Sequence, residues 1–334
     1  MGMKHQYIER QTGKVRSEQL YGDRIIRRLY GRERENGQTL FRALTSARFS
    51  AFLGYIHYDF SLGGRVPGYS KFIQEAGIDF NECLENFRHF KTMREIFERK
   101  IRYWECRPMP KASRTVVSPA DARVLVGSFH SSSSLFLKEK FFDYGELLGT
   151  NKQEWLNDFQ GGDFAVFRLT PEKYHYNHAP VSGKVLDIYE ISGTYNSCNP
   201  SAVVAAINPY SKNKRVVTIL DTNVPGGSEV GMVAMIEIVA LMVGDVVQCY
   251  SETRYDVPQP VRPGMFLRKG CPKSLYRPGS STDVLIFQSG RVTFASDLVR
   301  NLRAPGVESR FSLGFGRPLV ETEVLVRSCI AEIL

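Results

Sequence analysis

The sequence lacks closely spaced cysteines. Its six cysteines are spread over 334 residues, and no two of them form a Cys-x-x-Cys pair. Structural zinc sites and the disulfide scaffolds of small secreted domains depend on such clusters. We therefore expect no metal site, no disulfide framework and a reducing compartment.

Long apolar runs are also missing. Residues 230–247 form the longest apolar stretch, but a glycine and two acidic residues interrupt it, and many of its residues are β-branched. This pattern predicts two strands and a turn, not a membrane span. Near the N-terminus, Lys4, Glu9 and Arg10 leave no apolar segment of the kind that a signal peptide needs.

Basic residues are in excess over acidic ones. The chain has 44 Lys and Arg against 35 Asp and Glu, a net charge of +9. A basic surface suits an anionic partner, either nucleic acid or an anionic membrane. The charge is not accompanied by a zinc knuckle, a recognition helix or a stacking platform for single-stranded nucleic acid. We therefore expect the binding partner to be an anionic phospholipid membrane surface and not nucleic acid.

One segment of the N-terminal third is unusually aromatic. Residues 48–60 include Phe49, Phe52, Tyr55 and Phe60 beside a basic start. Such a helix suits the bilayer interface, where aromatic rings and arginine stems are both stable. Packing of the same rings on a protein core is the alternative, and the sequence leaves both interpretations open.

The hydrophobic pattern changes once, near residues 108–110. Before this point, apolar residues recur at three- and four-residue spacing, which predicts amphipathic helices, and these cover residues 17–30, 40–60 and 81–102. Beyond it, short apolar runs bounded by Gly, Pro, Asn and Asp predict strands, at residues 115–117, 122–129, 163–169, 183–191, 215–220, 230–243, 246–251 and 283–287. We expect an α+β fold, with a helical, membrane-associating layer over residues 1–108 and a β-rich sandwich or half-barrel over residues 109–334.

Three segments far apart in the sequence together supply the groups for nucleophilic chemistry. A Ser-Pro-Ala-Asp turn ends at Asp121, a Tyr-His-x-x-His-x-Pro block carries His175 and His178, and a Gly-Ser-Ser-Thr turn carries Ser280 and Ser281. A serine hydroxyl becomes a good nucleophile when an imidazole takes its proton and a carboxylate orients that imidazole. Taken singly, each segment is also compatible with an ordinary turn or with unrelated histidines.

The same segments resemble, in order, the motifs of the phosphatidylserine decarboxylases, pyruvoyl enzymes that cleave themselves. Further matching segments are Arg10-Gln11-Thr12-Gly13-Lys14-Val15, residues 97–108, Ser197-Cys198-Asn199-Pro200, Asn213-Lys214-Arg215, residues 283–288 and Arg291-Val292-Thr293-Phe294. The resemblance implies a β-rich catalytic domain with self-cleavage between Gly279 and Ser280. It also implies a covalent pyruvoyl cofactor made from the serine, which accepts electrons during decarboxylation.

The resemblance assigns a role to each candidate residue. It implies that His178 is the base, that Asp121 orients it, and that His175 acts in decarboxylation as a proton donor or a substrate contact. Ser280 is the predicted nucleophile, because Gly279 before it gives the backbone freedom that the attack needs. In another branch of the family, the spacing between the nucleophilic serine and the position that matches Phe287 favours Ser281 instead.

We therefore expect a decarboxylase that converts phosphatidylserine to phosphatidylethanolamine in phospholipid biosynthesis. It would be a heterodimer of its own α and β fragments, and a homodimer is weakly implied. Its expected place is the cytoplasmic side of the cell membrane, as a peripheral protein. Two alternatives remain open: an unprocessed relative that binds anionic lipid without catalysis, and a pyruvoyl decarboxylase of another amino acid.

Overall fold

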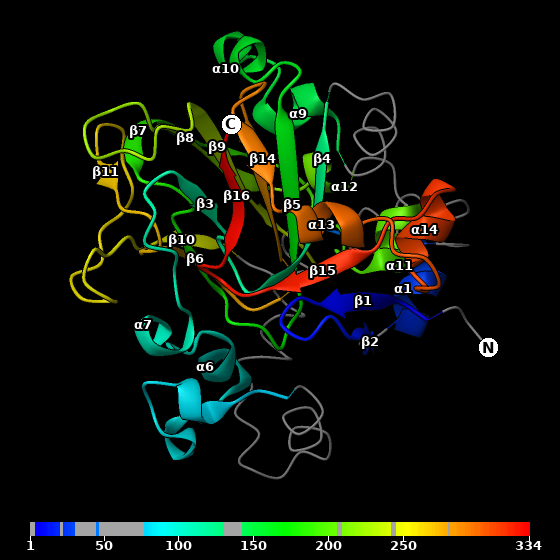
Figure 1. Ribbon diagram of the computed structural model, residues 1–334. Helices are drawn as coiled ribbons and strands as arrows, with labels where there is room; N and C mark the ends of the chain where they lie inside the picture. Colours follow the sequence, from blue (N-terminus) through cyan, green and yellow to red (C-terminus); the bar gives the residue numbers. More distant parts are fainter. Residues whose placement is uncertain are drawn as a thin grey trace.

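Strands make up most of the regular structure in this chain. The computed structural model describes residues 4–20, 23–30, 45–46, 77–129, 142–205, 209–241, 245–279 and 281–334. Within these ranges it contains one large sheet, two small sheets and short helices. Figure 1 shows the strands in the middle of the molecule with the helices around them. The fold is therefore α+β, with sheet predominating.

The large sheet has ten strands. They are β1 (Gln6–Glu9), β2 (Val15–Ser17), β4 (Ala122–Ser128), β5 (Asp163–Leu169), β7 (Gly183–Ile191), β8 (Arg215–Asp221), β9 (Met232–Val239), β11 (Phe266–Leu267), β13 (Ser281–Phe287) and β15 (Glu321–Val324). Their order across the sheet is β11-β7-β8-β9-β13-β5-β4-β15-β1-β2. Neighbours are antiparallel except β1 and β15, which are parallel.

Two three-stranded sheets accompany the large one. The first has the order β10-β12-β6, from β6 (Tyr176–His178), β10 (Val246–Gln248) and β12 (Pro272–Tyr276). The second has the order β14-β16-β3, from β3 (Thr115–Val117), β14 (Val292–Phe294) and β16 (Cys329–Ile333). Both sheets contribute buried side chains to the same core as one face of the large sheet. The β-rich part is therefore layered.

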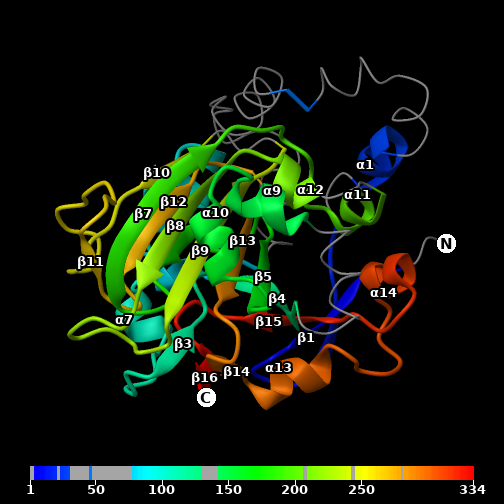
Figure 2. The same ribbon diagram turned by 90° about the horizontal axis from the view of Figure 1, so that it is seen from above.

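The helices are short. They are α1 (Asp23–Tyr30), η2 (Phe80–Glu82), η3 (Phe87–His89), α6 (Met93–Phe97), α7 (Tyr103–Cys106), α9 (Tyr144–Leu148), α10 (Gln153–Asp158), α11 (Pro200–Ala205), α12 (Pro209–Lys212), α13 (Ser296–Asn301) and α14 (Arg310–Phe315). Figure 2 shows α9 and α10 lying over β8 and β9 of the large sheet. Among the described residues, no helix is both long enough and apolar enough to cross a membrane.

The large sheet is buried on both faces. Along β13, Leu285 and Phe287 enter the core shared with the small sheets. Val284 and Ile286 enter the opposite core, which is covered by residues of α9, α10, α11, α12 and α14. Strands buried on both faces appear in the sequence as continuous apolar runs. This explains why β5, β9 and β13 could be predicted from hydrophobicity alone.

The strand predictions are largely confirmed. Residues 115–117, 163–169 and 183–191 form strands with the expected bounds. The stretch 230–247 contains β9 and β10, as its interrupted apolar pattern predicted. Sequence patterning works well here because apolar runs are bounded by turn-forming residues.

The helical layer expected over residues 1–108 begins with two strands instead of a helix. Residues 6–17 contain β1 and β2, a hairpin that joins the large sheet beside β15. Only the second half of the predicted helix at 17–30 is helical, as α1. The aromatic segment 48–60 lies outside the described residues, as does the predicted helix at 40–60 apart from residues 45 and 46.

The helix predicted over residues 81–102 is divided into short pieces. Asp79, Asn86 and Thr92 each accept a hydrogen bond from a backbone amide two or three residues ahead. Such caps start a new helical turn and compete with continuation of the preceding one. At Thr92 the cap is a complete capping box with Glu95. Local side-chain bonds therefore override the helical periodicity.

Candidate active site

The connection between β12 and β13 carries the predicted cleavage point. β12 belongs to a small sheet and β13 to the large sheet, so the chain changes layers between Tyr276 and Ser281. Gly279 has a φ of 140°, a value that residues with a Cβ atom rarely adopt. Ser280, the predicted pyruvoyl precursor, lies outside the residues that the structure describes.

Ser281, the alternative nucleophile, is the first residue of β13. Its backbone is paired with Leu169 of β5 and with Val239 of β9. Its hydroxyl is buried and has no hydrogen-bond partner among the described residues. Leaving a buried polar group unpaired costs about 1–3 kcal/mol. The hydroxyl is therefore available to a bound group at this end of the strand.

His178 lies at the end of β6, with its ring fully buried. Its Nδ1 is 2.8 Å from the carbonyl oxygen of Gly270, and its Nε2 is 3.0 Å from the hydroxyl of Tyr174. A carbonyl can only accept, so Nδ1 carries the proton of the neutral ring and Nε2 is the basic nitrogen. The ring of Tyr103 meets it edge-on, with centroids 4.7 Å apart. Packing and hydrogen bonding thus fix this imidazole in one orientation.

His178 is neutral at physiological pH. Burial lowers the pKa of His178 to about 3, and the charges of Arg327 and Arg107 act in the same direction. The carbonyl of Gly270 and the charge of Asp121 oppose this shift. A neutral imidazole is the form that can accept a proton. His178 is therefore in the protonation state that a general base requires.

The sequence led us to expect that Asp121 orients His178 directly. The structure shows no hydrogen bond between their side chains. The buried carboxylate of Asp121 accepts hydrogen bonds from Nε of Arg107 at 3.0 Å, from Nη2 of Arg107 at 2.8 Å and from the amide of Val326 at 2.8 Å. The Arg107 guanidinium keeps the pKa of Asp121 below its usual range despite burial. Because the Nδ1 position of His178 is taken by Gly270, Asp121 acts on that ring through its charge alone.

His175 is the second histidine of the block. Its ring stacks on Phe97, with centroids 3.5 Å apart, and is fully buried. Neither ring nitrogen makes a hydrogen bond to another described residue. Burial and the nearby charge of Arg99 hold the pKa of His175 well below its usual range, although the backbone of Lys173 acts in the opposite direction. Like His178, it is a neutral imidazole.

His178 lies next to the Ser-Pro-Ala-Asp turn, and His175 lies next to the segment that leads to the Gly-Ser-Ser-Thr turn. The amide of His178 donates to the carbonyl of Pro119 at 2.8 Å, in the turn that leads to Asp121. The carbonyl of His175 accepts from the amide of Tyr276 at 3.1 Å, just before the cleavage turn. In the described part of the chain, no hydrogen bond joins the Ser281 hydroxyl to either ring. The catalytic roles of Asp121, His175, His178 and Ser280 therefore stay predictions.

A layer of buried polar side chains beside the proposed cleavage turn was not predicted from the sequence. Glu237 of β9 pairs with Lys273 of β12, at 2.7 Å between Oε2 and Nζ, and both side chains are fully buried. Tyr276 and Asp283 lie beside this pair, with 2.7 Å between the phenol oxygen and Oδ1. The available signal was Glu237 itself, a charge in an otherwise apolar strand. An inward charge in such a strand predicts a buried partner.

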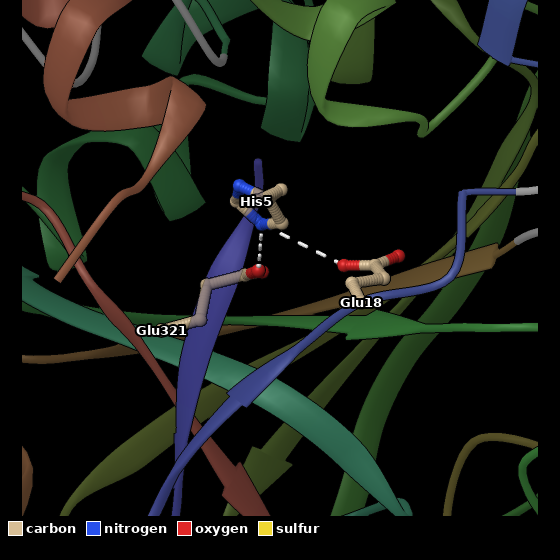
Figure 3. Close-up of side chains that lie close together, drawn as sticks. All are labelled: His5, Glu18 and Glu321. Carbon is tan, nitrogen blue, oxygen red and sulfur yellow. Dashed lines mark hydrogen bonds and ion pairs between the residues drawn. The ribbon is translucent and has the colours of Figure 1, made fainter. Parts of the chain in front are cut away.

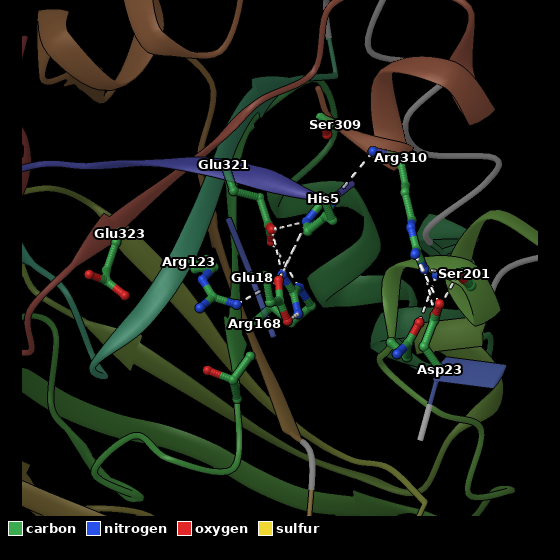
Figure 4. Close-up of polar contacts among 12 residues, drawn as sticks. His5, Glu18, Asp23, Arg123, Arg168, Ser201, Ser309, Arg310, Glu321 and Glu323 are labelled. Atoms are coloured by element: carbon green, nitrogen blue, oxygen red, sulfur yellow. Dashed lines mark hydrogen bonds and ion pairs between the residues drawn. The ribbon is translucent and has the colours of Figure 1, made fainter. Parts of the chain in front are cut away.

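A second buried network lies at the N-terminal hairpin. Figure 3 shows His5 between Glu18 and Glu321, with Nε2 of His5 at 2.8 Å from Oε2 of Glu321. The three ligand atoms lie within 4.8 Å of one another, as in a metal site. Figure 4 shows that Arg168 and Arg123 already pair with these carboxylates. The arrangement is an ion-pair network that anchors the hairpin to β5 and β15.

The Asn-Lys-Arg segment also has a structural role. Arg215 is buried and donates through Nε to the carbonyl of Leu147 at 2.9 Å. The Asn213 amide accepts from the Asn196 amide group and donates to the carbonyl of Val239. These bonds join α9 and the segment before α11 to the large sheet. Neither side chain is left free to bind a ligand.

Comparison with known proteins gives a consistent result. The family model of phosphatidylserine decarboxylase matches residues 93–307. The phosphatidylserine decarboxylase proenzyme of Fusobacterium nucleatum subsp. nucleatum is 27% identical over 318 residues, which are 93% of this chain and 96% of that protein. The proenzyme of Chlamydia muridarum is 32% identical over 244 residues, 73% of this chain and 74% of that protein.

A eukaryotic relative matches only in part. The phosphatidylserine decarboxylase proenzyme 3 of Schizosaccharomyces pombe is 27% identical over 91% of this chain but only 30% of its own length. The family match identifies a carboxy-lyase. The chain belongs to the phosphatidylserine decarboxylase family.

The first prediction concerns Asp121. Asp121→Asn keeps the size of the side chain but removes the charge that favours protonation of His178, so self-cleavage should slow by about 100-fold or more. It also leaves Arg107 with Glu82 as its remaining carboxylate partner, which should cost about 3 kcal/mol of folding stability. Gel analysis of cleavage over time and urea unfolding measure the two effects.

Glu82→Gln is the matched control, since it removes the other carboxylate on Arg107. It should lower stability but leave the cleavage rate within about threefold of the parent. Equal cleavage rates for Asp121→Asn and the parent would show that Asp121 is only structural.

The second prediction concerns the buried His175. The unfolded chain binds a proton at this residue below about pH 6.5, whereas the folded chain does not, so folding stability falls as the pH drops. The slope is about 1.4 kcal/mol per pH unit for one such histidine. In a Ser280→Ala background, which keeps one chain, His175→Gln should reduce the slope between about pH 6 and pH 5 by this amount.

Urea unfolding at several pH values gives the slope. His89→Gln, at an exposed position, is the matched control and should keep the slope of the background protein. An unchanged slope in His175→Gln would contradict the buried neutral state.

Proposed function

We propose that this chain is a proenzyme that cleaves itself and then converts phosphatidylserine to phosphatidylethanolamine. The observation that carries the proposal is the pair of buried histidines with lowered pKa beside the turn that leads to Gly279. The related proteins are phosphatidylserine decarboxylase proenzymes, which supports both the substrate and the processing. Ser280 after Gly279 supplies the hydroxyl.

Self-cleavage in this proposal proceeds in two proton-transfer steps. The Ser280 hydroxyl adds to the Gly279 carbonyl while His178 takes its proton. His178 returns this proton to the amide nitrogen as the C–N bond breaks, and the peptide bond becomes an ester with a free amine. His178 then removes the α-proton of residue 280. The bond between Cβ of residue 280 and the ester oxygen breaks. Gly279 leaves as a carboxylate, and residue 280 becomes dehydroalanine. Tautomerisation and hydrolysis release ammonia and leave a pyruvoyl group on the smaller chain.

The surroundings of the turn fit this covalent group. The φ of Gly279 is one that glycine adopts readily, and the hydroxyl of Ser281, which has no partner among the described residues, offers a polar contact. When present, the pyruvoyl carbonyl reacts with the substrate amine and accepts the electrons released as carbon dioxide leaves. The ring nitrogens of His175 are not bonded to any other side chain among the described residues, which suits the ring to contact the substrate or to deliver a proton to its α-carbon.

Anionic lipid is the proposed partner surface. The net charge of +9 favours association with an anionic leaflet, and the aromatic segment 48–60 would add interfacial contacts. We place the protein at the cytoplasmic side of the cell membrane as a peripheral protein. The two fragments would stay together as a heterodimer, because β12 and β13 lie on opposite sides of the cleavage point and are both part of the core. A homodimer of such units is also proposed.

The third prediction tests self-cleavage. The purified protein should run as a large chain ending at Gly279 and a small chain ending at Leu334, whereas Ser280→Ala should stay intact at 37.9 kDa. Intact mass of the small chain identifies the nucleophile: a pyruvoyl group followed by Ser281 means Ser280 reacted. One followed by Thr282 means that Ser281 did.

Catalysis needs its own assay. The cleaved protein should release carbon dioxide from phosphatidylserine in mixed micelles, and Ser280→Ala should not. A parent that remains a single chain but binds lipid would indicate a non-catalytic relative. A cleaved protein that decarboxylates only soluble amino acids would refute the lipid substrate.

The fourth prediction concerns membrane binding. The protein should co-sediment with vesicles that contain phosphatidylglycerol and be released progressively by salt, because surface charges are screened within about 10 Å at 0.1 M ionic strength. Vesicles of phosphatidylcholine alone serve as the control. Equal binding to both at every salt concentration would contradict the electrostatic contribution.

A further inference from the structure

Tyr276 is the last residue of β12 and is fully buried. Its hydroxyl reaches β13, where it lies 3.1 Å from the carbonyl oxygen of Thr282 and 2.7 Å from Oδ1 of Asp283. It also accepts a hydrogen bond from the amide of Ile238 in β9 at 3.0 Å. One phenol oxygen therefore joins the small sheet to two strands of the large sheet.

These contacts span the proposed cleavage point. Tyr276 precedes the bond between Gly279 and Ser280, while Thr282 and Asp283 follow it. Once that bond is cut, Tyr276 belongs to the large chain and its partners on β13 belong to the small chain. Ile238 and Thr282 are directly paired in the ladder between β9 and β13, so the hydroxyl fixes the start of β13 at its register.

The number of protons at this contact favours a neutral Asp283. The Tyr276 oxygen accepts from the Ile238 amide and has one proton to donate. If Asp283 is neutral, its O–H can donate to Tyr276 and the Tyr276 proton goes to the Thr282 carbonyl, so each of the three contacts of the phenol oxygen has its own proton. If Asp283 is ionised, that single proton serves two acceptors, and Oδ2 is buried without a partner among the described residues.

The charges nearby point the same way. Burial and the carboxylate of Glu237 hold the pKa of Asp283 well above its usual range, although the hydrogen bond with Tyr276 and the charge of Lys273 oppose this. Lys273 is already paired with Glu237 at 2.7 Å. Lys273 is therefore committed to Glu237, and no ion pair to Asp283 is found in the described part of the chain.

We propose that Tyr276 is a positioning residue for self-cleavage, and that the neutral Asp283 completes its hydrogen bonds. This inference rests on the proposed function. The attack needs the hydroxyl of the nucleophile and the carbonyl before it in near-contact geometry, and small displacements reduce such rates strongly. Tyr276 holds the backbone on both sides of that bond. After cleavage the same hydroxyl keeps the new chain ends together.

Tyr276→Phe tests the proposal, since it keeps the ring and removes the hydroxyl. Self-cleavage should slow by about tenfold or more, because three polar groups lose their common partner. Once cleaved, the variant should show a lower kcat with little change in KM for phosphatidylserine. Tyr189→Phe is the matched control, because it also removes a hydroxyl bonded to a carbonyl at 2.7 Å, that of Leu148, on a distant part of the sheet.

The control should cleave within about twofold of the parent rate. Cleavage of Tyr276→Phe at the parent rate, or slowed no more than in Tyr189→Phe, would overturn the proposal. If the parent itself remains one chain, the proposed function fails instead, so the two failures are distinguishable.

Asp283→Asn provides a second measurement that does not depend on folding of Tyr276→Phe. Asparagine is neutral and can donate to Tyr276, so cleavage near neutral pH should stay within about threefold of the parent. The parent rate should fall at high pH as Asp283 loses its proton, and the variant should lack this fall. Identical pH profiles for the parent and Asp283→Asn, or loss of cleavage in Asp283→Asn at every pH, would overturn the role of the neutral acid.

Discussion

The position of β13 between β5 and β9 is the constraint on which the site depends. Hydrogen bonds on both edges fix the register of Ser281 against Leu169 and Val239. A slip by one residue would exchange the two faces of the strand and bury the wrong side chains. Since only four residues connect β12 to β13, a fixed β13 also fixes the turn in which the chain is expected to cleave. The small sheet then brings His178 and His175 to the same end.

Burial determines the chemical state of the residues around this turn. Two of the carboxylates buried there are paired with cations, Asp121 with Arg107 and Glu237 with Lys273. Within the described ranges the two histidines form no ion pair, and they are neutral because the interior disfavours a charged ring. A neutral base in a dry site can take a proton without first losing one to water. The same exclusion of water strengthens the effect of the Asp121 charge over a distance.

The sequence predicted the strands well and the N-terminal segment poorly. Strands β5, β9 and β13 each contain a run of apolar residues, and turn residues bound them. The hairpin at residues 6–17 has no such pattern, and β2 is exposed along its whole length. It is held by pairing with β15 from the other end of the chain and by the contact of Arg10 with Asp297 at 2.6 Å. Its stability is therefore not local.

The sequence by itself determined the kinds of residue that form the candidate site: a glycine before a serine, two histidines three residues apart, and an aspartate in a Ser-Pro-Ala-Asp turn. Only the tertiary structure decided what these residues touch. Asp121 binds Arg107 and the amide of Val326, and His178 binds the carbonyl of Gly270. The reason is that hydrogen-bond partners in a sheet protein come from distant parts of the chain, whereas sequence periodicity reports only on neighbours.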